Sequence, residues 1–351
     1  MVEFEILVKE YRNGLEECAH FGFISIVSPE GIKYSVGDPQ QLMFYRSASK
    51  PVQAMPIIHM GIDKKYGLTG EEIAIMAGSQ RGELAHVDLI NLVIKKTGIK
   101  HKTLIMRPTY PLDQPTKEDM LRENIPPHKI YHNCIGKHIA CILIQRELGG
   151  REEDYWMLES PVQQLIMDYI SKVSGYPRSK IKAATDGCGV PVFAVPAQYV
   201  ANTYLHLACP ELIDNKYLRP AAERISSLMN QYPRMISGTN AICTLLNEDT
   251  NIVAKGGALG VYCFGMRNEK LGVAYKVIDG SYDELPFIAA NILKQILYDK
   301  SETIERLMYQ FPTVIKNDNN KNIGKYVAEF NIRKCRQTTI CGGIKYEKNF
   351  S

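Results

Sequence analysis

Residues 21–36 alternate apolar and polar side chains around the sequence Ser28-Pro29-Glu30-Gly31. A period-two pattern broken by a proline and a glycine predicts two antiparallel strands joined by a tight turn. Residues 4–10 show the same alternation and predict a further strand before the hairpin. The fold is therefore expected to contain an antiparallel sheet from its first residues onward.

The rest of the chain mixes helical and strand-like periodicities and has no repeat, which predicts an α/β or α+β fold. Five prolines between Pro108 and Pro127 predict an irregular stretch before Tyr131, at a domain edge or in a surface excursion. Helical patterns cover about 84–96, 136–148, 160–173, 212–231 and 285–298, and strand-like runs lie near 193–199, 252–255, 258–264, 271–278 and 326–332.

The length of 351 residues exceeds the usual size of one domain and predicts two domains or one domain with a large insertion. Lysine and arginine outnumber aspartate and glutamate by only 42 to 38. This balance gives no reason to expect nucleic acid or a membrane surface as a partner. We expect a small molecule instead.

The amino terminus, from Met1 to Ile6, lacks a basic segment followed by a long apolar stretch, and no apolar run reaches membrane-spanning length. Nine cysteines without a visible export signal predict a reducing compartment. There, cysteines serve more often as buried thiols or metal ligands than as disulfides. The sequence therefore predicts a cytoplasmic protein.

Ser47 and Lys50 stand three residues apart in the run Arg46-Ser47-Ala48-Ser49-Lys50-Pro51. On a helix they share a face, where a neutral amine can take the serine proton as the hydroxyl attacks a carbonyl carbon. Proline is tolerated in a first turn, so the apolar residues that follow predict a buried helix beginning near Ser47 to Lys50. Lys50 precedes this proline, however, and is thereby biased away from helical angles.

The same spacing recurs at Ser179 and Lys182, so the pattern alone is a weak signal. A serine at the start of a helix and a solvated lysine explain either pair without any catalysis. The neighbouring motifs must therefore separate the two readings.

Three loops contain groups suited to ligand contact. Residues 77–83 place two glycines around Ser79, which lets backbone and hydroxyl approach a ligand, although a helix-ending turn explains them equally. In residues 254–261, Lys255 ends an apolar strand before a glycine-rich turn. If Lys255 lies near Lys50 in space, its charge would help keep one of the two amines neutral. Otherwise it is an ordinary lysine at the end of a strand. Residues 237–244, which include Cys243, could line a pocket or form a plain loop.

Ligand-type groups are concentrated in residues 132–138, where two histidines accompany Asn133, Cys134 and Lys137 before an apolar helix. The loop 185–191 adds a carboxylate and another thiol between glycines. Two thiolates with one or two nitrogens suit zinc. The spacing is not that of a zinc finger, so buried structural cysteines are the alternative.

Taken in order, the Ser47, Ser79, Cys134, Cys188 and Lys255 motifs resemble the L-asparaginase II family of the Rhizobium etli inducible type, from about residue 5 to about residue 340. This resemblance implies a fold similar to serine β-lactamases, penicillin-binding proteins and glutaminases. It implies a single domain over 1–351, with a mainly helical portion at roughly 70–235 between sheet-forming amino- and carboxy-terminal segments. A homodimer is also implied.

The resemblance implies hydrolysis of L-asparagine to L-aspartate and ammonia, with zinc as the bound metal. It assigns Ser47 as nucleophile, Lys50 as its base, Ser79 as a hydroxyl relay and Lys255 as a second amine. It implies zinc ligands at Cys134, Lys137 and Cys188, and a substrate-binding group at Asp186, Arg46, Gly82, Glu83 and Cys243.

The chain departs from the family pattern at four positions. Gln80 and Arg81 replace a histidine and a serine, Ile135 replaces a serine, and Leu259 stands where glutamate is usual. The groups implied for catalysis and metal binding are all present, so substrate identity is affected more than reaction type. The alternatives are a serine hydrolase acting on glutamine or a small peptide-like amide, and a zinc- or amino-acid-binding protein without turnover.

Overall fold

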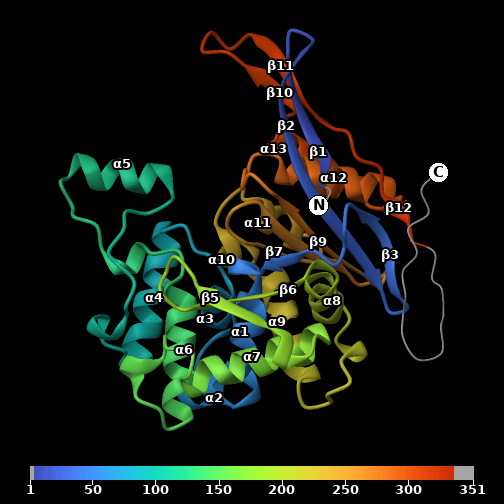
Figure 1. Cartoon of the computed structure of the whole chain (residues 1–351). Helices are drawn as coiled ribbons and strands as arrows, with labels where there is room; N and C mark the ends of the chain where they lie inside the picture. Colours follow the sequence, from blue (N-terminus) through green and yellow to red (C-terminus); the bar gives the residue numbers. More distant parts are fainter. Residues whose placement is uncertain (1–3, 336–351) are drawn as a thin grey trace.

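The computed structural model describes residues 4–335 (Figure 1). Residues 1–3 and 336–351 lie outside it, including the first residues of the amino terminus and the last part of the resemblance. Its larger sheet is built from both ends of the chain. The strands of this sheet are β1 (Glu5–Arg12), β2 (Leu15–Ser28), β3 (Gly31–Val36), β7 (Ile252–Gly256), β8 (Val261–Met266), β9 (Leu271–Val277), β10 (Val314–Lys316), β11 (Asn322–Ala328) and β12 (Arg333–Lys334).

Every pairing in the larger sheet is antiparallel, and its main strand order is β10-β11-β1-β2-β9-β8-β7. The predicted hairpin is β2 and β3, in which Ile26 pairs with Tyr34 across the turn. A smaller sheet of order β4-β6-β5 contains β4 (Leu42–Phe44), β5 (Lys182–Thr185) and β6 (Pro191–Pro196). The hairpin prediction is thus confirmed.

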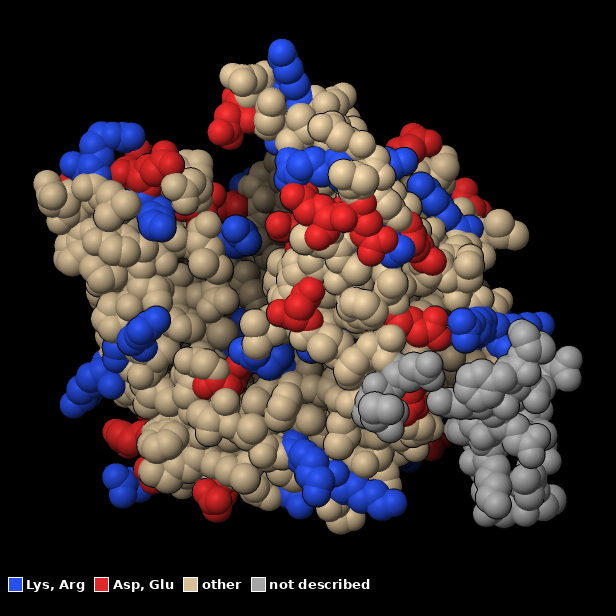
Figure 2. All heavy atoms as spheres, turned by 45° about the horizontal axis from the view of Figure 1, so that its top comes forward, with Lys and Arg blue, Asp and Glu red and all other residues tan. Residues whose placement is uncertain are grey.

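Most helices lie between the two sheet-forming ends of the chain and gather below the larger sheet in Figure 1. From above, the surface is hollowed between this helical part and the sheet (Figure 2). The helices are α1 (Lys50–His59), α2 (Ile62–Tyr66), α3 (Gly70–Ala77), α4 (Leu84–Thr97), α5 (Gln114–Arg122), α6 (Ile135–Glu147), α7 (Pro161–Ser174), α8 (Ala197–Ala208), α9 (Arg219–Gln231), α10 (Pro233–Ser237), α11 (Ile242–Asn247), α12 (Leu285–Gln295) and α13 (Ser301–Gln310).

Helices cover both faces of the larger sheet. On one face α8 packs against β2, β8 and β9, and it approaches so closely that a Cβ on Gly272 would lie 2.1 Å from the carbonyl oxygen of Ala201. Tyr275 follows three residues later on the same strand and therefore faces the other way, where its hydroxyl donates to the carbonyl of Leu285 in α12. The predicted α+β class, an antiparallel sheet flanked by helices, is confirmed.

Helix α1 is the centre of the helical part. Its residues from Lys50 to Ile57 are all buried, because α3, α6, α7 and α9 surround it. A short 3-10 helix, Arg46–Ser49, precedes it, and Lys50 adopts helical angles (φ −56°, ψ −38°) in spite of Pro51. The predicted buried helix beginning near Ser47 to Lys50 is confirmed.

Some boundaries were predicted wrongly. The strand expected at 193–199 ends at Pro196, where α8 begins, and the helix expected from residue 212 begins at Arg219. The strand expected from residue 258 begins at Val261, because Leu259 (φ 58°) and Gly260 (φ 73°) form a turn. At the boundary between β6 and α8, apolar residues continue from one element into the next, so the hydrophobic pattern does not mark it.

The stretch expected to be irregular contains α5. Its prolines do not exclude a helix, because Pro115 lies in the first turn, and Asp113 caps the helix by accepting from the backbone N–H of Thr116. Helix α13 was not predicted at all. The omission of α5 comes from reading prolines as interruptions when one of them marks a helix start.

Of the eight cysteines in the described part of the chain, none forms a disulfide, and six are buried. In residues 4–335 these cysteines are therefore free thiols. No helix in this range is both long enough and apolar enough to traverse a bilayer.

Candidate active site

Ser47 lies where the smaller sheet meets α1. The backbone N–H of Tyr45 donates to the carbonyl of Phe193 in β6 (3.0 Å), and Arg46 then takes a left-handed conformation (φ 48°) that turns the chain into the 3-10 helix. The Tyr204 hydroxyl in α8 donates to the carbonyl of Ala48 (2.7 Å). Ser47 is thereby held half-buried at the amino-terminal end of a helix, where the helix dipole favours negative charge.

The Lys50 side chain is completely buried and points to Ser79 at the end of α3. Its Nζ lies 2.9 Å from the Ser79 Oγ and 3.1 Å from the carbonyl oxygen of Asn133. Burial lowers the pKa of Lys50 to about 8, and the positive charges of Lys255 and Lys137 act in the same direction. A substantial fraction of Lys50 is therefore neutral near pH 8 and able to accept a proton.

The Ser47 side chain makes no hydrogen bond within residues 4–335, so Lys50 contacts the hydroxyl of Ser79 and not that of Ser47. The predicted dyad is thus present as two neighbouring residues at a helix start, without a direct bond between them. Contacts of this kind often tighten only when substrate is bound.

Lys255 is the second buried amine of the region. It lies in β7, and its Nζ donates to the carbonyl of Gly256 (2.8 Å). Burial lowers its pKa, and its charge lowers that of Lys50. Gly257 brings this strand end against the start of the 3-10 helix, because a Cβ there would lie 2.7 Å from the carbonyl oxygen of Tyr45.

Cys134, Lys137 and Cys188 converge from the start of α6 and from the turn between β5 and β6. The Lys137 Nζ lies 3.0 Å from the Cys188 Sγ, and all three side chains are buried. A hydrogen bond from Cys188 is the main cause that lowers the pKa of the Cys134 thiol. Two sulfurs and a nitrogen are a donor set that zinc accepts, so the residues fit this metal.

Lys137 carries its proton in this arrangement. Burial alone would lower the pKa of Lys137, but the negative charges of Cys134 and Asp186 and the hydrogen bond to Cys188 raise it above the usual value. A metal bound by the Lys137 nitrogen would have to displace that proton.

Asp186 and Arg46, both expected at the substrate site, bind each other. The Arg46 Nε and Nη2 atoms each lie 2.9 Å from the Asp186 Oδ1, and the Lys137 Nζ lies 3.5 Å from Oδ2. Burial would raise the pKa of Asp186, but the charges of Lys137 and Arg46 lower it. The carboxylate is therefore ionised, and a substrate ammonium would share it with two protein cations.

The loop after α3 packs against its neighbours through the two residues that depart from the family pattern. Gln80 is buried, and its amide group donates to the carbonyls of Ile130 (3.1 Å) and His132 (3.0 Å). The Arg81 Nη2 donates to the carbonyl of Leu112 (3.3 Å). Gln80 thus attaches this loop to the segment that carries Cys134, while the Arg81 side chain stays partly exposed.

Gly82 and Glu83 hold the loop in place. Gly82 has φ 83° and leaves no room for a Cβ beside Pro111 (2.4 Å). The Glu83 carboxylate accepts from the Thr239 hydroxyl (3.0 Å) and from the Arg234 Nη2 (3.1 Å). Its oxygens therefore join this loop to residues 237–240, and the predicted contact with substrate would have to compete with these bonds.

Cys243 and Leu259 lie on either side of the Lys255 turn. The Cys243 Sγ is buried in α11 and accepts from the backbone N–H of Gly256 (3.1 Å), so it supports the strand that carries Lys255. Leu259 is 58% exposed in its left-handed conformation.

Two contacts were missed by sequence reasoning. Lys50 is held by the Asn133 carbonyl, a backbone atom that leaves no signature in residue type. The Tyr282 hydroxyl donates to the carbonyl of Gly257 (2.7 Å), and burial raises the pKa of Tyr282 above its usual value. The sequence gives no reason to single out this tyrosine.

The family model described as L-asparaginase II matches residues 8–328. Among curated proteins, none matches the sequence. Solved structures that match include a β-lactamase from Mycobacterium bovis, with 12% identity, 78% of this chain and 94% of that chain covered, and a TM-score of 0.39. A class C β-lactamase from Rhodobacter sphaeroides has 13% identity, coverages of 79% and 95%, and a TM-score of 0.42. A Bacillus glutaminase has 13% identity, coverages of 80% and 92%, and a TM-score of 0.37. At TM-scores below 0.5, these similarities say nothing of this chain's activity.

Proposed function

The chain belongs to the L-asparaginase II family, and we propose that it hydrolyses the side-chain amide of L-asparagine through an acyl-enzyme on Ser47. The observation that carries the proposal is the buried Lys50 amine, which lies one turn after Ser47 and 2.9 Å from the Ser79 hydroxyl. An amine whose pKa is lowered to about 8 by burial can serve as a base without a histidine.

The reaction has two halves. The Ser47 Oγ attacks the amide carbon while its proton passes to Lys50 through the Ser79 hydroxyl, and the same proton then returns to the departing nitrogen, which leaves as ammonia. Water next attacks the Ser47 ester, gives a proton to Lys50 and releases aspartate, and the proton returns to the serine oxygen. The backbone N–H of Ser47, at a helix start, is the expected donor to the oxyanion.

The pair formed by Arg46 and Asp186 supports an amino-acid substrate. A guanidinium pairs with an α-carboxylate by parallel hydrogen bonds, and a carboxylate holds an α-ammonium. Both groups lie within one ion pair, 2.9 Å apart. Arg81 is a further cation of the region, and its size is the reason to include glutamine and small peptide-like amides among the substrates tested.

Cys134, Lys137 and Cys188 would hold the zinc ion. Bound there, zinc would supply a fixed positive charge that keeps Asp186 oriented toward the substrate. The residues themselves already achieve part of this, since the Lys137 Nζ lies 3.5 Å from the Asp186 carboxylate. A homodimer and a cytoplasmic location complete the proposal.

The test is ammonia release from L-asparagine by the purified protein and by Ser47→Ala. Ser179→Ala is the matched control, since Ser179 begins the second Ser-x-x-Lys pattern but is exposed. Loss of activity in Ser47→Ala alone supports the proposal, and undiminished activity in that variant rejects the nucleophile.

A panel of amides separates the substrates, and a covalent serine probe separates catalysis from binding alone. If glutamine or a peptide-like amide is hydrolysed faster than asparagine, that amide is the preferred substrate. Bound zinc and bound asparagine without labelling of Ser47 would identify a binding protein.

A further inference from the structure

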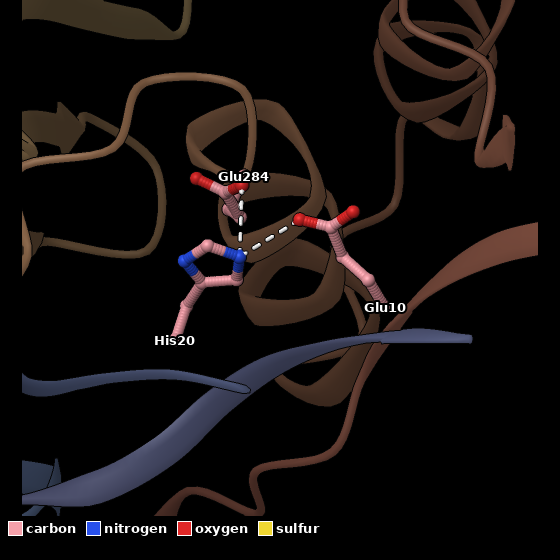
Figure 3. A group of neighbouring side chains, drawn as sticks. All are labelled: Glu10, His20 and Glu284. Atoms are coloured by element: carbon pink, nitrogen blue, oxygen red, sulfur yellow. Dashed lines mark hydrogen bonds and ion pairs between the residues drawn. The ribbon is translucent and has the colours of Figure 1, made fainter. Parts of the chain in front are cut away.

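A second group of ligand-type side chains lies at the other end of the larger sheet. Glu10 of β1, His20 of β2 and Glu284, which precedes α12, form what we call the His20 cluster (Figure 3). In residues 4–335 it is the one group of three or more His, Cys, Asp or Glu whose ligand atoms all lie within 4.8 Å of one another. We propose that the His20 cluster is a structural binding site for a divalent transition-metal ion, zinc in the first place.

The sheet itself brings the first two ligands together. In the antiparallel pair of β1 and β2, Val8 lies opposite His20, so Glu10 is the diagonal neighbour of His20 on the same face. Both glutamates point at the same ring nitrogen (Figure 3), with the His20 Nε2 3.0 Å from the Glu10 Oε1 and 3.3 Å from the Glu284 Oε1. Tetrahedral zinc with bonds of about 2.1 Å keeps its ligand atoms roughly 3.4 Å apart, so only small shifts would admit the ion.

The other nitrogen of His20 is already oriented as in many metal sites. Its Nδ1 lies 2.7 Å from the Asp279 Oδ2. A carboxylate that accepts from one ring nitrogen fixes the tautomer in which the other nitrogen offers its lone pair. In the His20 cluster that lone pair would face the two glutamates.

Glu284 provides an independent sign that a ligand is missing. Its side chain is only 2% exposed, yet its Oε2 atom is buried with no hydrogen-bond partner among the described residues. A buried carboxylate oxygen without a partner is costly. An ion bound at Oε1 would place positive charge beside this buried carboxylate.

The charges around the ring favour an ion of charge two. Three carboxylates, those of Glu10, Asp279 and Glu284, contact one imidazole, which supplies at most one positive charge. Figure 2 shows Asp and Glu side chains on the sheet end of the molecule, with Lys and Arg side chains among them. Imidazole together with carboxylates suits zinc and its first-row neighbours better than calcium or magnesium. His20 and Glu10 are 12% and 19% exposed, which leaves a route for entry.

The consequence is structural. The ion would tie the β1–β2 pair to residues 278–284, which already meet β2 through the bond from the Ile278 N–H to the Phe21 carbonyl (2.8 Å). The same segment carries Tyr282, whose hydroxyl contacts Gly257 beside Lys255. The inference does not depend on the proposed amidase activity, because no residue of the His20 cluster belongs to that site.

Zinc counting tests the site apart from the cysteines. Full-length Cys134→Ser/Cys188→Ser protein is stripped with a chelator, equilibrated with zinc chloride and analysed for bound metal after gel filtration. We expect one zinc per chain, lost when His20→Asn is added and retained when Glu16→Gln is added. Glu16 lies in the same strand but is paired with Lys9, outside the cluster. If the double serine variant does not fold, the same comparison in the wild-type background is expected to show a loss of one zinc equivalent.

Two further measurements keep the test independent of folding. Cobalt bound to the double serine variant should show only the weak visible bands of nitrogen and oxygen ligands, without thiolate charge transfer. Asp279→Asn keeps all three ligands and should weaken zinc binding by about 10- to 100-fold. Absence of bound zinc, or zinc binding that neither His20→Asn nor Asp279→Asn weakens, would overturn the proposal and leave His20 as an ion-paired imidazolium.

Discussion

The chain contains a serine and a lysine three residues apart at two places, and the two pairs have very different surroundings. Lys50 is completely buried at the start of α1, with Ser47 half-buried before it. Ser179 and Lys182 are both exposed, and they do not share a helix, because the 3-10 helix ends at Lys180 and β5 begins at Lys182.

This difference shows which surroundings would allow a serine and a lysine three residues apart to act as a catalytic pair. Lys50 has a hydroxyl partner from α3, a carbonyl partner before α6 and a second amine in β7, all distant in sequence. These elements exclude water, and burial then lowers the pKa of Lys50 to about 8. The spacing of residues is identical in the two pairs, so the tertiary environment carries the functional distinction.

The largest effect is expected for Lys50→Met. Methionine fills nearly the same volume in the buried site without an amine, so the protein should fold while kcat for asparagine falls by about 10³-fold or more. Ammonia release measures the rate, and thermal unfolding checks the fold. Full activity in a folded Lys50→Met protein would show that Ser47 and Lys50 are no more catalytic than the exposed pair, Ser179 and Lys182.

A smaller loss is expected for Ser79→Ala, which removes the hydroxyl that Lys50 contacts. Proton transfer through a relay is worth about 10²-fold, so kcat should fall by that order while KM stays close to the wild-type value. Ser226→Ala provides the control, since Ser226 is buried and its hydroxyl donates to the Glu223 carbonyl within α9. Equal activity in the two variants would remove Ser79 from the proposed relay.

Local patterns were sufficient for parts of the fold. The β2–β3 hairpin was predictable because period-two alternation indicates strands. The buried α1 was predictable because a proline is favoured in the first turn of a helix. Helix α5 was not predicted, since the same residue type, proline, marks both irregular segments and helix starts. Helix α8 was not predicted either, because the apolar run of β6 continues into its first residues.

In the candidate site, too, some residues could be predicted from the sequence and others could not. Ser47, Lys50, Ser79 and Lys255 could be selected from sequence because each stands in a distinctive motif, and their catalytic roles stay predictions. The ion pair between Arg46 and Asp186, the Asn133 carbonyl and the His20 cluster depend on contacts between distant segments. No local pattern encodes such contacts, since either partner alone is an ordinary residue.

A shift in pH dependence is expected for Lys255→Met. The proposed base is neutral Lys50, so activity should rise as the pH passes through about 8. The charge of Lys255 lowers the pKa of Lys50, and its removal makes the Lys50 ammonium easier to form. The rising limb of kcat/KM against pH should therefore move to higher pH, and a limb that stays in place or moves down would show that the two amines are uncoupled.

The smallest effect is expected at the second pair. Lys182→Met changes an exposed side chain at the edge of the smaller sheet, where β5 pairs with β6 alone among the described strands. Surface substitutions of this kind usually change the free energy of unfolding by no more than about 0.5 kcal/mol. Within residues 4–335, no element covers Lys182 to desolvate its amine. Activity should stay within about twofold of wild type, measured by ammonia release beside Lys50→Met. A large loss of activity in Lys182→Met without unfolding would mean that exposure does not separate the two pairs, and burial of Lys50 would no longer explain its role.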